Sequence, residues 1–375
     1  MLEKTLNNKR IVVIHQRDWG VKHGFEISKK LYKCGAKLGA INFKKSTEYL
    51  IENQKDLKFD SVINESDISD NTRKILLQNQ YNLKDFKNDF DIDNIWKFAS
   101  TLRHYSLSYK KKFPFSYEQS QSDEEIKNYI LAFALKLKEF FINFNPDLVI
   151  GYNFGDIRHH LIEKICNKNK IPFFFSSDTK VQNINCFYYD INSSRSFFID
   201  RVKKLNNNII NSKNYFNAEK YIRENNEKFK IAYHMKNMNL NKRWYNFNDF
   251  KKLLSSIRYH FKKIKINKKI LSASDNTNLF YLIRDYVSER KNIIETQNFK
   301  SYDNLNKVGK FIFFPLQHFP ESQLGLLNPV HDHVLNTIKI LARHLPSELT
   351  LVVKDHPWSF GKRSKSFLSK IKNTI

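Results

Sequence analysis

Cysteine, glycine and proline are scarce in this sequence, and each scarcity excludes a class of protein. The 375 residues include only 3 Cys, 9 Gly and 8 Pro. Cys34, Cys166 and Cys186 lie far apart and form no CxxC pair, so neither a disulfide framework nor a zinc site is predicted. So little Gly and Pro excludes collagen-like and linker-like chains. A reducing cytoplasm is the expected compartment.

Long uninterrupted apolar runs are also missing. No such run follows the charged residues near the N-terminus, so no signal peptide is expected. The most apolar segment, 129–144, contains Lys136, Lys138 and Glu139, and it is too short and too charged to span a bilayer. We therefore expect a cytoplasmic protein, either soluble or peripheral at the inner face of the cytoplasmic membrane.

Acidic residues are too few to balance the basic ones. The chain has 38 Asp and Glu against 64 Lys and Arg, a formal net charge of +26. This balance favours polyanionic partners, namely nucleic acid, anionic lipid or phosphorylated substrates. The alternative is codon bias, since Lys and Asn are abundant throughout. What is plentiful is apolar: 41% hydrophobic residues, including 32 Phe, exclude a disordered chain, and the length predicts two domains.

Strand and helix patterns alternate over residues 1–180. Short apolar runs predict strands at 9–16, 38–43, 145–153 and 170–177. Residues 155–169 predict a helix, and 123–144 predict a longer one behind the capping box of Ser122 and Glu125. This order predicts an α/β fold with an N-terminal Rossmann-like, doubly wound domain.

The patterns are weaker in two other parts of the chain. Segment 44–120 is polar and patchy and predicts only helical pieces. Residues 201–300 hold 23 Lys and Arg against 8 Asp and Glu, an excess of 15 positive charges, and they show no strand–helix alternation. We therefore expect a helical, basic connecting segment over 181–302.

One stretch of this basic segment has a clear helical period. Residues 249–266 place apolar side chains on one face and most of their lysines elsewhere. A basic amphipathic helix of this kind suits an anionic membrane surface. The alternative is an ordinary helix that packs its apolar face on the protein and solvates its lysines.

Two apolar runs near the C-terminus end in the same way. "FIFFPLQHFPESQ" begins at Phe311 and "LTLVVKDHP" begins at Leu349, and each stops at a polar cluster with His and Pro. A helix predicted over 332–345 separates them, so the two runs form a parallel βαβ unit. The carboxyl ends of parallel strands share one edge, where ligands of open α/β sheets bind. We therefore expect 317–321 and 354–357 to line one cleft.

The residue types at these strand ends suit a phosphate. The ammonium group of Lys354 and the imidazole of His356 make an anion clamp, and Pro357 ends the ladder. Gln317 and His318 add donors and acceptors, and Glu321 adds an acid. The alternative is that all of these are ordinary strand-terminal polar residues.

The segments "FFPLQHFPESQL" and "LPSELTLVVKDHP" resemble the C-terminal region of bacterial capsule polysaccharide biosynthesis proteins. That family shows a "PLQ" or "PLH" element followed by Pro-Glu, and later a "VKEHP" element. The resemblance is close over about 310–360 and architectural over 1–180. It implies a GT-B-like transferase with two Rossmann-like domains and a nucleotide-sugar donor, CMP-linked to an acidic sugar such as Kdo in several members.

The resemblance also implies roles for single residues. Lys354, His356 and Pro357 would contact the donor, while Gln317, Pro320 and Glu321 would line the same cleft. Residues 1–180 would form the acceptor-side domain, facing a glycolipid or glycan. The second Rossmann-like domain, 303–375, has only two predicted strands, too few for a complete nucleotide-binding domain, so we expect it to be partial or truncated.

An inverting transferase needs a base to deprotonate the acceptor hydroxyl. The candidates lie in the loops after predicted strands of the first domain, and they are Asp18, His23, Asp156 and His159, of which Asp18 is preferred. Asp156 has an alternative role as the N-cap of the following helix. His331 and His333 are only two ligands, so no metal is predicted. No cofactor is expected either.

Two other functions stay open. A short C-terminal domain favours a non-catalytic remnant that docks in a polysaccharide assembly complex. The basic segment with its Tyr and Phe residues favours a nucleic-acid-binding protein. No recognition motif of the usual nucleic-acid-binding modules is present, so nucleic acid is not the partner we expect.

Overall fold

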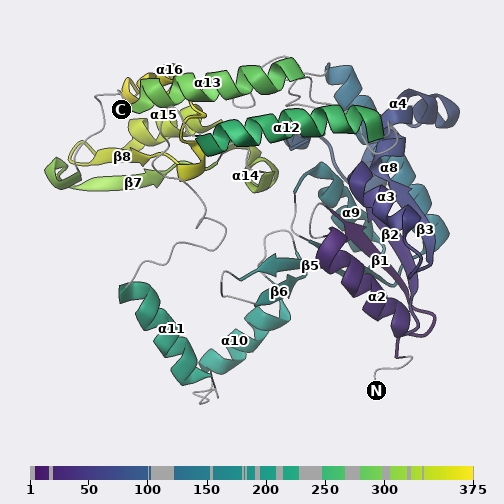
Figure 1. Ribbon diagram of the computed structural model, residues 1–375. Helices are drawn as coiled ribbons and strands as arrows, with labels where there is room; N and C mark the ends of the chain where they lie inside the picture. Colours follow the sequence, from purple (N-terminus) through teal and green to yellow (C-terminus); the bar gives the residue numbers. More distant parts are fainter. Residues whose placement is uncertain are drawn as a thin grey trace.

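The computed structural model describes residues 5–16, 20–99, 101–102, 122–152, 155–179, 181, 184–190, 195–207, 214–227, 247–266, 279–297, 305–318, 322–331 and 333–374. These residues form one six-stranded and one two-stranded sheet, with helices around both (Figure 1). The predicted α/β, Rossmann-like architecture is confirmed.

The larger sheet has the strand order β3-β2-β1-β4-β5-β6. Its strands are β1 (Arg10–His15), β2 (Lys37–Asn42), β3 (Phe59–Asn64), β4 (Leu148–Tyr152), β5 (Phe173–Asp178) and β6 (Asn185–Tyr188). All neighbours are parallel except β5 and β6. The order reverses between β1 and β4, which is the switch point where doubly wound folds bind ligands.

Helices cover both faces of this sheet. They are η1 (Gly20–Gly24), α2 (Phe25–Lys33), α3 (Lys45–Asn53), α4 (Glu65–Asn79), α5 (Leu83–Phe90), α6 (Trp96–Ala99), α8 (Asp123–Phe144) and α9 (Ile157–Lys168). Alternate side chains of β1 point to opposite faces: Val12 and Ile14 join the core under α8, while Ile11 and Val13 join the core under α2. Both faces are buried, so the strand reads as a continuous apolar run.

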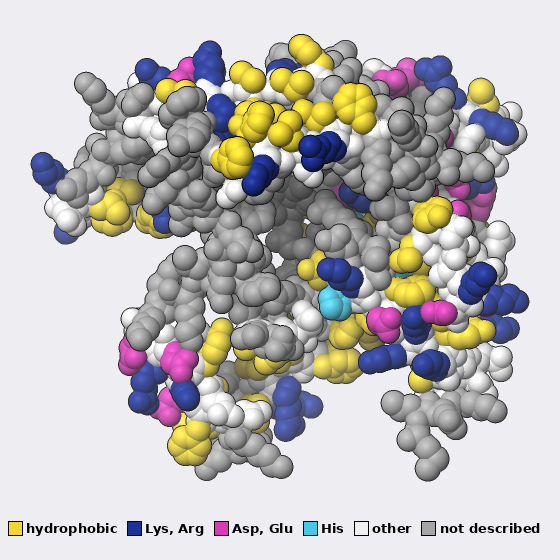
Figure 2. Space-filling view, viewed as in Figure 1, with side chains coloured by type: hydrophobic (Ala, Val, Ile, Leu, Met, Phe, Trp, Pro, Cys, Tyr) yellow, Lys and Arg dark blue, Asp and Glu magenta, His cyan; other side chains and the backbone are white. Residues whose placement is uncertain are grey.

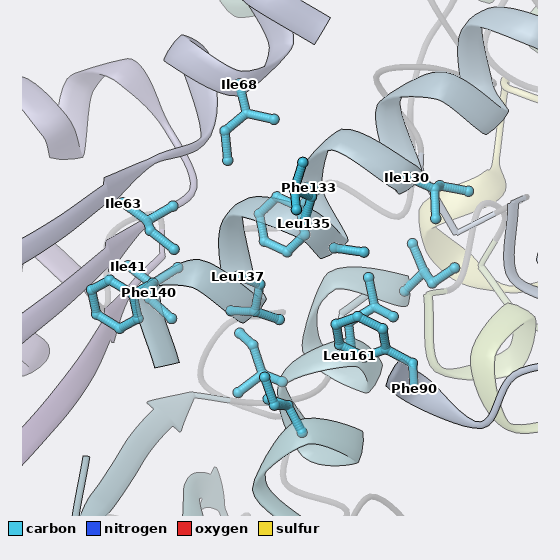
Figure 3. Packing of buried hydrophobic residues seen from close by; sticks show 14 of the residues in the cluster. Ile41, Ile63, Ile68, Phe90, Ile130, Phe133, Leu135, Leu137, Phe140 and Leu161 are labelled. Atoms are coloured by element: carbon cyan, nitrogen blue, oxygen red, sulfur yellow. The ribbon is translucent and has the colours of Figure 1, made fainter. Parts of the chain in front are cut away.

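Helix α8 begins and ends as its sequence predicts. Ser122 accepts a hydrogen bond from the backbone of Glu125, whose carboxylate in turn accepts one from the Ser122 backbone, so the capping box is formed. Behind it, Phe133, Leu137 and Phe140 pack into the large core (Figure 3). Gly39 of β2 allows this close approach, because a Cβ atom there would lie 2.9 Å from the Phe144 ring.

Two strands of this sheet were not predicted from the sequence. β3 lies within segment 44–120, at the sheet edge, and Ile63 is the one buried side chain among its six residues, so its apolar pattern is weak. β6 is a short antiparallel strand at the opposite edge. The helical pieces expected within 44–120 are present as α3 to α6.

The expectation of a helical segment over 181–302 fails at its start, because Asn185–Tyr188 form β6 of the larger sheet. From residue 197 on, the segment is helical where the structure describes it. Its helices are α10 (Phe197–Asn207), α11 (Tyr215–Glu227), α12 (Phe247–Ile266) and α13 (Leu279–Gln297). Helices α12 and α13 lie side by side (Figure 1). Arg290 near the end of α13 forms an ion pair of 3.1 Å with Asp249 in the first turn of α12. The two helices are therefore antiparallel.

The second sheet pairs β7 (Phe311–Pro315) with β8 (Thr350–Lys354) in parallel, as predicted. Around it lie α14 (Ser322–Leu327), α15 (Val334–His344) and α16 (Lys365–Lys372). Leu316, Ile338, Leu351 and Ile371 belong to a small core of their own. Leu326 of α14 instead packs into the large N-terminal core, so the segment after β7 is tied to the first sheet.

Candidate functional site

The parallel pairing of β7 and β8 brings their following loops together. Pro315 lies opposite Lys354, and the Leu316 backbone N–H donates a hydrogen bond to the Lys354 carbonyl oxygen at 2.8 Å. Both strands therefore end at the same edge. The described residues of the two polar clusters therefore lie near one another at this edge. That they line one cleft stays a prediction.

Two histidines, one from each loop, meet at this edge. The ring centroids of His318 and His356 lie 5.6 Å apart, with the rings tilted by 45°. Both side chains are half-buried. The hydroxyl oxygen of Ser359, which is fully buried, lies 3.5 Å from Nδ1 of His318. The two half-buried imidazoles are groups that bind phosphate oxygens, whereas the buried hydroxyl lies against the ring of His318.

Arg363 contacts both of these loops. Its Nη2 donates to the Gln317 carbonyl oxygen at 2.7 Å, and its Nε lies 3.3 Å from Oδ1 of Asp355. The guanidinium also covers the Phe367 ring, with its centre 5.0 Å from the ring centroid. The Arg363 side chain is only 4% exposed. A single buried cation thus fixes the relative position of the two loops.

The remaining donor-site candidates differ in exposure. Gln317 and Lys354 are exposed, and Pro357 is half-buried and begins a short 3-10 turn. Burial raises the pKa of Asp355, although the charges of Arg363 and His356 and a backbone hydrogen bond oppose this effect. Lys354, His356 and Arg363 outnumber Asp355, so the edge carries an excess of basic groups.

Helix α13 supports the loop after β8. Gly361 has φ +77°, and a Cβ atom there would lie 2.5 Å from Cγ1 of Ile293. The Asn292 side chain donates to the Lys362 carbonyl oxygen at 3.5 Å. The loop backbone therefore contacts α13 directly, although the sequence places this helix in the connecting segment 181–302.

Asp156 forms the N-cap of α9 and belongs to a buried ion cluster. Its carboxylate accepts a hydrogen bond from the Arg158 backbone at 2.9 Å and from Arg158 Nε at 3.0 Å. Burial alone would raise the pKa of Asp156, but the Arg158 charge and the bonds from His159 and Arg158 hold it well below its usual range. A carboxylate so stabilised in its charged form is a poor proton acceptor, so this geometry favours a structural role.

The same cluster joins distant parts of the N-terminal unit. Arg158 Nη1 lies 3.7 Å from Glu65, which accepts a hydrogen bond from the Tyr129 hydroxyl at 2.8 Å. At the switch point, His159 Nε2 lies 2.8 Å from Oε1 of Gln16, the residue that follows β1. The chain after β1 is thereby linked to α9, the helix that follows β4.

Some of the predicted site residues cannot be placed in the structure. Asp18, Pro320 and Glu321 lie outside the described residues, so these candidates stay predictions. Within the described ranges, no group of three or more His, Cys, Asp or Glu side chains is placed to hold a metal ion. No helix in the described part of the chain is both long enough and apolar enough to cross a membrane.

Arg363 and Ser359 were not identified from the sequence. Both follow the "HP" element within seven residues, and a basic residue so close to a candidate phosphate loop was the available signal. The contribution of α13 had no local signal, because the contact between Ile293 and Gly361 spans 68 residues of chain.

One comparison with known proteins gives a match. Residues 197–373 match the sequence profile of the capsule polysaccharide biosynthesis protein family, over slightly less than half of the chain. No curated protein and no solved structure matches it. The matched region contains α13, both strands of the small sheet and the loops with His318, His356 and Arg363. This match supports the family and a role in capsule polysaccharide biosynthesis.

Proposed function

We propose that this protein is a glycosyltransferase of the GT-B type that acts in capsule or surface polysaccharide synthesis. It transfers a sugar from a nucleotide-sugar donor to a glycolipid or glycan acceptor, without a metal. The observation that carries the proposal is the meeting of His318 and His356 at the shared end of two parallel strands. The family match over the same region supports it.

Sugar transfer requires positive or hydrogen-bonding groups around the leaving phosphate, and the shared ends of β7 and β8 carry such groups. When the bond from the anomeric carbon to the donor phosphate breaks, negative charge grows on the phosphate, and fixed cations or hydrogen-bond donors stabilise it. His318, His356 and Lys354 are the groups proposed for this task. The resemblance of the "HP" element to that of transferases with CMP-linked acidic sugars such as Kdo makes a CMP-sugar the favoured donor.

The acceptor side is assigned to the six-stranded sheet. Its switch point, between β1 and β4, is where such a domain binds ligands. The base that deprotonates the acceptor hydroxyl is proposed to be Asp18, in the loop after β1. Because Asp156 is committed to Arg158 and to the cap of α9, it is the weaker candidate.

Nucleotide titration tests this function. The full chain is titrated with CMP, CDP, UDP and GDP while its melting temperature is followed. A ligand at 100 times its dissociation constant stabilises the protein by about 2.7 kcal/mol. We expect CMP-selective stabilisation that His356→Ala abolishes. The control is His344→Ala, because that exposed histidine bonds only to the Ile340 carbonyl of its own helix. A cooperatively melting chain that binds no nucleotide contradicts the proposal.

A further inference from the structure

Helices α12 and α13 carry the same pattern of exposed apolar side chains. The residues are Phe247, Phe250, Leu254 and Phe261 on α12, and Phe280, Ile283, Val287 and Ile294 on α13. Each set follows the spacing i, i+3, i+7, i+14, which at 3.6 residues per turn falls within about 60° of the helix circumference. Their exposed fractions run from 39% to 67%. These eight side chains are called the α12–α13 face.

Each of the two helices packs against the protein through side chains other than those of the α12–α13 face. On α13, Asn292, Ile293 and Thr296 are buried, and the first two contact the loop after β8. On α12, Leu253 and Ile257 are half-buried. The alternative of an ordinary helix with its whole apolar side packed on the protein therefore accounts for only part of each helix. The exposed stripes need another explanation.

Basic side chains border the stripe on α12. Lys251 and Arg258 are exposed and lie about 20° to 40° around the helix from Phe247. The Lys251 ammonium lies 4.7 Å from the centroid of the Phe247 ring. Figure 2 shows hydrophobic side chains gathered over α12 and α13, with Lys and Arg side chains beside them. Apolar and cationic groups thus share one surface.

Acidic side chains of α12 and α13 form ion pairs with basic side chains of the same two helices. Helix α12 has six Lys and Arg and one Asp, and α13 has three of each sign, so the pair carries a net charge of +5. Asp285 pairs with Arg284 at 2.6 Å, and Glu295 lies 3.8 Å from Lys291. Asp249, the one acid of α12, pairs with Arg290. The charge left over is positive.

We propose that the α12–α13 face docks on the surface of an anionic lipid bilayer. Phe and Ile side chains enter the boundary between headgroups and acyl chains, and neighbouring lysines reach lipid phosphates while their stems stay on apolar surface. A second copy of the chain fits this face less well, because it would bring two surfaces of net charge +5 together. The wider excess of 15 positive charges over residues 201–300 adds attraction to anionic lipid.

The docked helix pair also holds the candidate donor site. One side of α13 carries the exposed stripe, and another side carries Ile293, which supports Gly361 in the loop after β8. Docking would therefore place that loop next to the membrane surface. The membrane proposal rests on the exposed apolar side chains and the positive charge of α12 and α13. A test of it is therefore independent of the transfer reaction.

Vesicle co-sedimentation of the full chain tests the proposal. The vesicles are phosphatidylcholine alone, or equal amounts of phosphatidylcholine and phosphatidylglycerol. We expect the protein to sediment with the anionic vesicles and to stay in solution with the neutral ones. The variant Phe250→Ser/Phe261→Ser should lower the partition coefficient by about tenfold or more. Lys251→Glu/Arg258→Glu should lower it as well, and should reduce its dependence on salt.

A matched variant controls for the loss of exposed apolar groups in general. Leu77→Ser/Phe216→Ser removes two strongly exposed side chains of α4 and α11, and it should bind vesicles like the unmodified protein. All variants should keep the melting temperature. Equal sedimentation with both vesicle types, no sedimentation with either, or binding unaffected by Phe250→Ser/Phe261→Ser overturns the proposal. If sedimentation velocity shows that the protein is a dimer, and only Phe250→Ser/Phe261→Ser disrupts that dimer, the face would instead bind a second copy of the chain.

Discussion

His318 and His356 face each other with ring centroids 5.6 Å apart, although 38 positions separate them in the chain. The parallel register of β7 and β8 creates this proximity, because Pro315 lies opposite Lys354 and both strands therefore end at the same edge of the sheet. Because the rings lie this close together, we expect their contributions to the binding of one ligand to depend on each other.

A double-mutant cycle on these histidines measures that dependence. His318→Ala and His356→Ala are each expected to weaken nucleotide binding by about tenfold or more, and the double variant by less than the product of the two effects. Coupling energies between residues in contact are about 0.5–3 kcal/mol. Calorimetric titration with CMP provides the affinities. Strictly multiplicative effects would show that the two rings contribute to binding independently, which contradicts the expected coupling.

Arg363 is expected to control the geometry of both loops. Arg363→Lys keeps a positive charge but cannot contact the Gln317 carbonyl and the Asp355 carboxylate with one planar group. We expect CMP affinity to fall about tenfold, which is roughly 1.4 kcal/mol. Arg343→Lys, an exposed change on α15, is the control and should bind like the unmodified protein. Unchanged affinity in Arg363→Lys would remove this positioning role.

Gly361 is expected to tolerate no side chain. In Gly361→Ala, the residue keeps a φ of +77° that disfavours alanine, and the new Cβ would lie 2.5 Å from Ile293. Left-handed backbone costs about 1–2 kcal/mol, and overpacking adds about 1–3 kcal/mol. Urea denaturation should show this loss of unfolding free energy. Gly309→Ala is the matched control, because a Cβ there meets nothing within 4 Å. Equal stability of the two variants would show that α13 does not support the loop.

Asp156 is expected to matter for stability. Asp156→Asn retains a capping side chain but removes the charge that balances the buried Arg158. Breaking a buried ion pair on one side costs about 3–5 kcal/mol, so the unfolding free energy should fall by that order. Asp93→Asn, at an exposed pair with Lys87, is the control and should change stability little. A stable Asp156→Asn protein with lost transfer activity would instead identify Asp156 as a catalytic base.

His15 is expected to make the protein sensitive to acid. Burial lowers the pKa of His15 from 6.5 to about 3, so the folded state keeps the imidazole neutral where the unfolded chain takes up a proton. Below pH 6.5 the unfolded state binds more protons, and stability therefore falls as pH drops toward about 3. The slope from this residue is at most about 1.4 kcal/mol per pH unit. Melting temperatures of His15→Gln measured over this range should show a flatter pH dependence than the unmodified protein, and parallel curves would contradict this assignment.

The sequence was informative wherever a short segment carried its own pattern. The apolar runs that became β1 and β4 are buried in the larger sheet, so their apolar pattern was visible in the sequence. The runs of β7 and β8 were equally visible, although Phe311, Ile312 and Phe313 of β7 are exposed in the structure. The capping box of Ser122 and Glu125 marked the start of α8. β3 escaped prediction because an edge strand with partly exposed side chains needs few apolar residues.

The sequence by itself determined the parallel pairing near the C-terminus, since two apolar strands joined by one amphipathic helix can pair in few other ways. It also determined which polar residues follow the strands, and hence the candidates His318 and His356. Only the tertiary structure decided that Arg363 joins the two loops and that Ile293 of α13 lies against Gly361. These contacts join segments far apart in the chain, and they depend on how helices pack rather than on any local period.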